Sequence, residues 1–261
     1  MELSSANAEF EALVARLNDP EALEEYKRSH DRYRPDLFPR LLGKLLVFCG
    51  NVVYGKEPSY LKFRAVEIIA RVPYHSWEAV IFTLLTLFFS NEKKALELSK
   101  LAKFSRLAQD NETMHVIVIS QLAEREEHAG FMRHSLIPML FAFFYFWASY
   151  FLYFIRPKWS YELNYLFESH AFEQYSRFID QREQELREKP VDSAFLAWYG
   201  RQPSNQYEFF RSVRNDELVH RNESVEHIDQ AADQKGRRWI ALALAGLFAL
   251  GVSLWLWHEW F

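Results

Sequence analysis

The sequence has little that would break a helix or cross-link a chain. Its 261 residues include 8 glycines, 9 prolines and a single cysteine. One cysteine excludes an intramolecular disulfide framework and a zinc site built from cysteines. A net charge of −4 and a pI near 6.2 give no electrostatic case for a nucleic-acid partner. Strand-like alternation is rare and apolar residues recur at helical spacing over long stretches, which predicts an all-α protein.

Aromatic residues are abundant, at 17% of the chain, and they favour contact with a membrane. The N-terminus has neither the positive nor the apolar region of a secretory signal. From Trp239 to Trp257 the chain carries no charge, which is long enough to cross a bilayer, with Trp at both ends. Basic residues directly before this run place that side in the cytoplasm. We expect residues 235–261 to be a C-terminal transmembrane anchor, with a buried helix as the alternative.

The rest of the chain divides into a polar lead-in, residues 1–35, and a helical domain, residues 36–234. Residues 36–53 form an apolar helix that is either interfacial or an ordinary core-facing helix. Residues 135–155 also lack charge, and by hydropathy alone they could be a second span. Pro138 lies inside this segment, and a crossing here would separate Glu112 from Glu168. We therefore expect it to pack on the bundle and dip into the lipid face, while a true span stays open.

Two Glu-x-x-His pairs are the main chemical signal: Glu112 with His115, and Glu217 with His220. Residues three apart are neighbours on a helix surface, so each pair shares a face. Glu67 precedes the first pair and Glu168 lies between the two, both in apolar surroundings. The order Glu, Glu-x-x-His, Glu, Glu-x-x-His is the ligand set of a two-metal carboxylate site in a four-helix bundle. The same spacing also occurs between carboxylates on solvent-exposed helices, so the surrounding sequence has to distinguish a metal site from these.

Four segments supply that context. They are residues 65–73 (AVEIIARVP), residues 111–115 (NETMH), residues 157–159 with 167–171 (PKW and FESHA), and residues 214–220 (RNDELVH). In this order they resemble the motifs of the alternative oxidase family, the membrane-bound di-iron quinol oxidases. The resemblance covers roughly residues 36–230. It implies a ferritin-like four-helix bundle with a di-iron centre, extra membrane-associating helices and the C-terminal transmembrane helix.

The resemblance also assigns roles to individual residues. It implies two iron ions held by the six residues of the ordered set, and a redox-active tyrosine at Tyr175, seven residues after Glu168. Residues that orient the ligands by hydrogen bonds would be Asn111, Tyr199 and Asp216. The implied quinol pocket contains Lys62, Val66, Phe167, Ala171 and Gln174. The chain departs from the family at Thr113, at Ser169 and His170, at Gly200, which stands where the family has Trp, and at Lys62, which stands where it has Arg.

The function implied is a terminal oxidase that passes electrons from membrane quinol to O₂ and forms water without pumping protons. Its partners would be quinol, O₂ and the lipid bilayer, with no nucleic acid and with a homodimer open. The location expected is the bacterial inner membrane, with the catalytic domain on the cytoplasmic face. A di-iron hydroxylase of quinones or lipids uses the same ligands and is the first alternative. A metal-free, tail-anchored interaction protein is the second.

Overall fold

The computed structural model describes residues 2–126 and 129–232. Within these ranges every regular element is a helix, which confirms the all-α prediction. The predicted anchor at residues 235–261 lies outside the described residues. The helices are α1 (Glu2–Arg16), α2 (Pro20–Arg28), α3 (Leu37–Tyr54), α4 (Tyr60–Ala70), α5 (Val72–Phe88), α6 (Glu92–Glu126), α7 (Ile137–Ile155), α8 (Pro157–Glu188), α9 (Ala194–Tyr199) and α10 (Gln206–Ala232), with a π-helical turn, η1 (Met132–Leu136), directly before α7.

The helix starts follow from local chemistry. The Asp19 side chain accepts hydrogen bonds from two backbone N–H groups in the first turn of α2, and Ser59 does the same for one N–H group of α4. Helices α5, α7 and α8 each carry proline in the first turn, where a missing N–H costs nothing. Helix α4 ends at Ala70 and α5 begins at Val72, so Pro73 stands in the first turn of α5.

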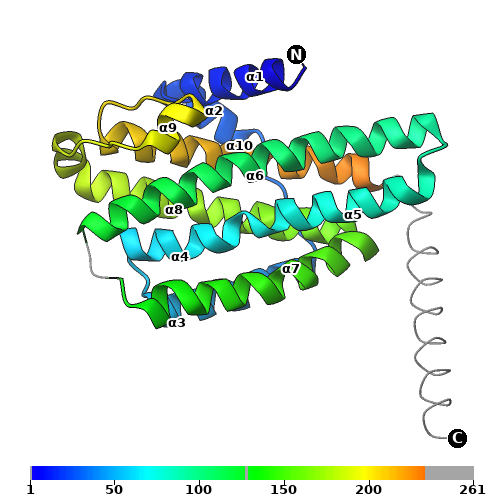
Figure 1. Ribbon diagram of the computed structural model, residues 1–261, viewed down its shortest axis with the longest axis horizontal. Coiled ribbons are helices and arrows are strands. Elements are labelled where there is room, and N and C mark those ends of the chain that lie inside the picture. Colours follow the sequence, from blue (N-terminus) through cyan, green and yellow to red (C-terminus); the bar gives the residue numbers. More distant parts are fainter. Residues whose placement is uncertain (1, 127–128, 233–261) are drawn as a thin grey trace, which may run out of the picture.

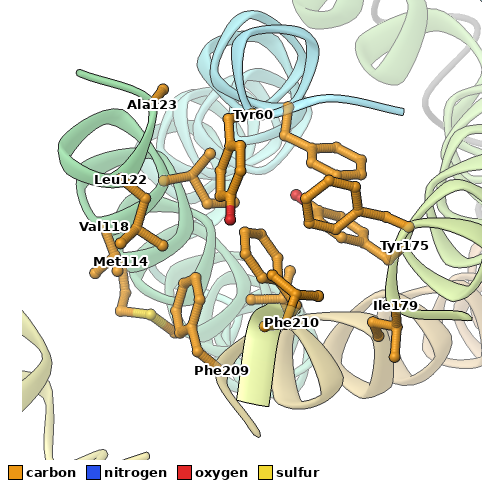
Figure 2. Packing of buried hydrophobic residues seen from close by; sticks show 14 of the residues in the cluster. Tyr60, Met114, Val118, Leu122, Ala123, Tyr175, Ile179, Phe209 and Phe210 are labelled. Carbon is orange, nitrogen blue, oxygen red and sulfur yellow. The ribbon is translucent and has the colours of Figure 1, made fainter. Parts of the chain in front are cut away.

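Four helices, α4, α6, α8 and α10, form the bundle that carries the predicted ligands. Helix α10 runs along α8, and α4 runs along α6 (Figure 1). Aromatic rings from three of these helices fill the space between them, including Tyr60, Tyr175 and Phe210, and α6 closes the cluster with aliphatic side chains (Figure 2). Bulky rings in this interior hold the four helices at fixed separations, because a close-packed core resists deformation.

Helices α3 and α7 lie on one side of the bundle (Figure 1), and many of their exposed side chains are apolar. Phe48 on α3 is 64% exposed and Phe144 on α7 is 68% exposed, and most large apolar residues of both helices share this exposure. By length and composition alone, Leu37–Tyr54 and Met132–Ile155 could each cross a membrane, and little of either is buried in the protein. Helix α7 nevertheless packs on α4, α5 and α8, and Gly43 lets α3 approach Leu166 of α8 closely. The exposed apolar layer indicates contact with a membrane.

The N-terminal segment is part of the packed structure. Val14 of α1 and Leu17, directly after α1, are buried against Leu218 and Val219 of α10. Between α8 and α10 lies the short helix α9, flanked by proline and glycine residues. Gly200 ends α9 in the left-handed conformation, with φ of 102°, where a side chain would be strained.

Candidate metal centre

The six predicted ligands converge in the middle of the bundle. Each helix contributes what the sequence predicted: Glu67 on α4, one Glu-x-x-His pair on α6, Glu168 on α8 and the other pair on α10. All six side chains are buried. Their ligand atoms form two groups, and within each group they lie within 4.8 Å of one another. The groups are Glu67, Glu112, His115 and Glu217, and Glu112, Glu168, Glu217 and His220. Glu112 and Glu217 belong to both groups, as carboxylates that bridge two cations would.

The nitrogen atoms of both histidines face carboxylates. His115 Nδ1 lies 3.4 Å from Glu112 Oε2, 3.5 Å from Glu217 Oε1 and 3.6 Å from Glu67 Oε2. His220 Nδ1 lies 2.9 Å from Glu112 Oε1. Nitrogen and oxygen lone pairs thus point into a shared space, which is the arrangement of ligands around a cation.

The chemistry of these atoms fits a metal. Several buried atoms of the cluster make no hydrogen bond of acceptable direction: Glu67 Oε2, both carboxylate oxygens of Glu112 and of Glu217, His115 Nδ1, and both ring nitrogens of His220. A buried polar atom left without a partner costs about 1–3 kcal/mol, so such a concentration needs an explanation. Carboxylate oxygens with imidazole nitrogens are the donor set of non-haem iron and related ions. Buried carboxylate and histidine clusters able to hold metal are therefore present.

The pKa shifts in the cluster also favour bound cations. Burial, followed by the charge of Glu112, raises the pKa of Glu67 to about 7. Burial and the charges of Glu112 and Glu168 raise the pKa of Glu217 well above its usual value. Burial opposes a charge on His115, yet the neighbouring Glu112 and the bond to Asp216 raise its pKa well above the ordinary value. A metal-free cluster thus retains protons, because four carboxylates cannot all ionise in so small a volume without cations.

Two tyrosines each donate a hydrogen bond to one glutamate of the cluster. Tyr175 on α8 donates a hydrogen bond to Glu67 Oε1 on α4. Tyr74 on α5 donates to Glu168 Oε1 on α8, at 2.8 Å, and receives a hydrogen bond from Asn164. The sequence reasoning picked Tyr175 and missed Tyr74. A signal was available, because each tyrosine lies seven residues after a glutamate of the set, although only Glu168 and Tyr175 share one helix.

Comparison with known proteins agrees with the geometry. Residues 22–228 match the sequence model of the family described as Alternative oxidase. The chain belongs to the alternative oxidase family. It is 24% identical over 185 residues to Ubiquinol oxidase 4, chloroplastic/chromoplastic, from Arabidopsis thaliana, a match that covers 63% of this chain and 50% of that protein. The chain thus spans about half the length of this curated relative. No solved structure matches it.

The three residues predicted to orient the ligands lie together beside the cluster. His115 Nε2 is 2.8 Å from Asp216 Oδ2, and Asn111 Nδ2 donates to Asp216 Oδ2 at 3.3 Å and to the Tyr199 hydroxyl at 3.2 Å. Asp216 also accepts two hydrogen bonds from Arg201, a buried residue that the sequence reasoning missed. The one available signal was its position directly after Gly200, where this chain departs from the family.

An apolar cavity of about 200 Å³ lies among α3, α4, α7 and α8. All five residues predicted for the quinol pocket line it: Lys62, Val66, Phe167, Ala171 and Gln174. His170 lines it as well, and its deep end reaches Glu168 and Tyr175. The cavity therefore connects the apolar side of this alternative oxidase with the candidate metal centre.

The polar end of the cavity has a defined hydrogen-bond pattern. Lys62 Nζ donates to Gln174 Oε1 at 3.0 Å, to the Lys56 carbonyl at 3.1 Å and to Asn51 Oδ1 at 3.2 Å. An ammonium group has three N–H donors, so all three are used. Burial lowers the pKa of Lys62. Because lysine can only donate, the carbonyl oxygen of Gln174 must face it, and the Gln174 amide nitrogen is left to serve another partner.

Proposed function

We propose that this protein is a quinol oxidase that transfers electrons from membrane quinol to O₂, forms water and pumps no protons. One observation carries the proposal: an apolar cavity that begins between α3 and α7 ends at Tyr175 and Glu168, beside the buried cluster. Membership of the alternative oxidase family and the name of the curated relative, a ubiquinol oxidase, support it.

The six converging residues would hold two iron ions. Two Fe²⁺ ions carry four positive charges, which balance the four carboxylates and leave the two imidazoles as neutral donors. When bound, the pair supplies one-electron steps between ferrous and ferric iron, so that two of the four electrons needed to reduce O₂ are stored at the site. Glu112 and Glu217 belong to both ligand groups, so each would help to hold both ions.

The chain's own residues would bind the quinol head and hold protons. Gln174 is oriented by Lys62, so its amide nitrogen can donate to an oxygen of the quinol ring. Tyr175 lies at the deep end of the cavity, and its hydroxyl proton points at Glu67 Oε1. In this proposal the phenol would stand between quinol and the cluster: it would give an electron to the oxidised metal pair and its proton to Glu67, and quinol would return both to Tyr175.

The apolar layer of α3 and α7 would sit in one leaflet, on the cytoplasmic face of a bacterial inner membrane, with residues 235–261 as the anchor. Quinol could then enter the cavity from the lipid without crossing water. Protons released from quinol and protons taken up to form water would belong to the same face, so no charge would cross the membrane. We also propose that the protein forms a homodimer, as the family resemblance implies.

The decisive experiment uses the purified full-length protein, loaded with iron and reconstituted in lipid vesicles. Oxygen uptake should depend on added quinol, resist cyanide and consume two quinols for each O₂. An oxygenated quinone or lipid product would instead identify a hydroxylase. Metal analysis that finds fewer than one iron per chain would favour an interaction protein that keeps the fold without the chemistry.

A further inference from the structure

Beside the candidate metal centre, Arg201 is held between two carboxylates. Its Nη1 and Nη2 donate to Asp216 at 2.5 and 2.8 Å, and its Nε and Nη2 donate to Glu11 at 2.8 and 2.9 Å. Arg201 is 8% exposed and Asp216 is fully buried. Paired, two-point contacts of this kind fix both the position and the plane of a carboxylate.

Asp216 passes this constraint to a proposed ligand. Its Oδ2 lies 2.8 Å from His115 Nε2, so the proton of a neutral His115 belongs on Nε2 and the lone pair on Nδ1. Nδ1 is the atom that faces Glu67, Glu112 and Glu217. For His220, the other proposed histidine ligand, Nδ1 lies 2.9 Å from Glu112 Oε1, whereas Nε2 has no hydrogen-bond partner within the described part of the chain. Asp216 therefore orients the ring of His115, whereas no residue of the described chain orients the ring of His220 through Nε2.

The arginine reaches Asp216 because of the turn before it. Gly200 takes up a left-handed conformation that ends α9, and the backbone N–H of Arg201 then bonds to the carbonyl of Leu196. Glu11 on α1 accepts the remaining hydrogen bonds of the Arg201 side chain. Helix α1 precedes the family match at residues 22–228. Arg201 is thus held by a helix that lies outside the matched region.

We propose that Arg201 is a positioning residue which, with Glu11 of α1, holds Asp216 against His115 and so directs His115 Nδ1 at the metal centre. The inference rests on the proposed metal centre. Glu11, Arg201 and Asp216 together carry one net negative charge, so the group opposite His115 favours an imidazole that donates from Nε2. Loss of Arg201 leaves Asp216 buried without its main cation, free to turn away from His115.

The same contacts could serve only to hold α1 against α10. A variant of a second buried arginine, Arg221, distinguishes this role from the positioning of Asp216. Arg221 on α10 is 3% exposed and donates to Asp31 at 2.9 Å and to the carbonyl of Lys27, so it fastens α2 to the same helix. None of the hydrogen bonds of Arg221 reaches Asp216. An arginine that only fastens helices should behave like Arg221.

The test measures binding of Co²⁺ to the metal-free, full-length protein, by equilibrium dialysis and by visible absorption. The unaltered chain should bind two Co²⁺. Arg201→Gln should weaken one of the two sites roughly 10- to 100-fold and alter its absorption bands, the range typical for loss of a partner that orients a ligand. Arg201→Lys should lie between, because a lysine cannot make both paired contacts. Arg221→Gln should bind both ions as the unaltered chain does.

Thermal unfolding of the metal-free proteins shows whether each variant folds. If Arg201→Gln does not fold, Glu11→Gln tests the outer half of the arrangement, and it should weaken one site severalfold while the other is retained. Equal cobalt binding by the unaltered chain, Arg201→Gln and Glu11→Gln overturns this inference alone. Equal losses in Arg201→Gln and Arg221→Gln overturn it too. No cobalt binding by the unaltered chain overturns the metal centre and this inference with it.

Discussion

Tyr175 donates its hydrogen bond to Glu67 on another helix, and not to Glu168, the glutamate two turns before it on its own helix. Tyr74 makes the converse contact, from α5 to Glu168 on α8. The two tyrosines differ in surroundings, since Tyr175 lines the cavity whereas Tyr74 is packed among Trp77, Phe104 and His220. Only the first lies between the cavity and the cluster, and this difference predicts different consequences for their loss.

Tyr175→Phe should retain iron and lose quinol oxidation, because the ligands stay but the phenol between quinol and cluster is gone. Tyr74→Phe is the matched control: it removes one hydrogen bond to Glu168, worth about 1.5–3 kcal/mol for a charged acceptor, and should lower stability while turnover persists. Iron content, oxygen uptake and thermal unfolding of both proteins check this. Full turnover by Tyr175→Phe would remove the phenol from the mechanism.

The shared carboxylates should matter more for metal content than the unshared ones. Glu217 belongs to both ligand groups and Glu67 to one. We therefore expect Glu217→Ala to hold less than one iron per chain and to lose oxidase activity, and Glu67→Ala to hold about one. Iron analysis after desalting decides the matter. Equal iron content in the two variants would show that Glu217 does not bridge.

Metal removal should lower thermal stability, because ions that bind only the folded state stabilise it by mass action, by about 2.7 kcal/mol at 100 times Kd. Chelation should also leave protonated carboxylates in the cluster, since burial and the charge of Glu112 hold the pKa of Glu67 at about 7. Unfolding temperatures before and after chelation test this. Re-addition of Fe²⁺ should restore the higher value, and failure to do so would mean that chelation had acted elsewhere.

Substitutions at the polar end of the cavity should affect quinol binding. Gln174→Leu removes the amide that Lys62 orients and should raise KM about tenfold, the equivalent of about 1.4 kcal/mol, with a smaller effect on kcat. Gln184→Leu, an exposed position on the same helix, should leave KM unchanged. Steady-state oxygen uptake over a range of quinol concentrations provides both constants. An unaltered KM in Gln174→Leu would place the quinol head elsewhere.

The joint between α3 and α8 should weaken in acid. Asp36 precedes α3 and accepts hydrogen bonds from Lys158 Nζ at 2.9 Å and Trp159 Nε1 at 3.0 Å, which lower the pKa of Asp36 below 3.8. A carboxyl group whose pKa is lower in the folded state stabilises above its unfolded pKa and loses this effect as pH falls through the folded pKa. Asp36→Asn should thus lower the unfolding temperature at pH 7, and this difference from the unaltered chain should shrink as pH falls through the lowered pKa of Asp36. Asp180→Asn, an exposed position with the same change in charge, should show no such pH dependence.

The apolar layer can be located directly. Cys49 is the only cysteine in the sequence, so Cys49→Ser permits a single label at a chosen position. A fluorescent label at Phe144→Cys on α7 should be quenched by lipid-borne quenchers in vesicles. A label at Trp198→Cys, 77% exposed on α9 at the opposite side of the bundle, should be quenched from water (Figure 1). Quenching of both labels from water would exclude α7 from the bilayer.

The metal-binding cluster was predictable because its signals are local. A Glu-x-x-His pair needs only one helix turn to bring its side chains together, and the apolar context of Glu67 and Glu168 marked the other two positions. The five cavity residues followed from the family resemblance. The all-α fold followed from the scarcity of glycine and proline.

Contacts between remote segments were not predictable in the same way. Glu11 and Arg201 are separated by 190 positions, and no periodicity links a lead-in helix to a turn so far along the chain. Helix α9 was missed because six residues between breakers give too short a pattern. For residues 36–53 the apolar pattern was read correctly, but it is the same for a core-facing helix and for an exposed one. Only the packing of α3 distinguishes the two.

For the proposed quinol oxidase, the cavity among α3, α4, α7 and α8 would also determine which quinol concentration governs turnover. A substrate that reaches Tyr175 only through the apolar layer is drawn from a two-dimensional solvent, so its mole fraction among the lipids sets the rate of encounter. Dilution of the vesicles in buffer should then leave turnover unchanged, whereas dilution of quinol with extra phospholipid should slow it.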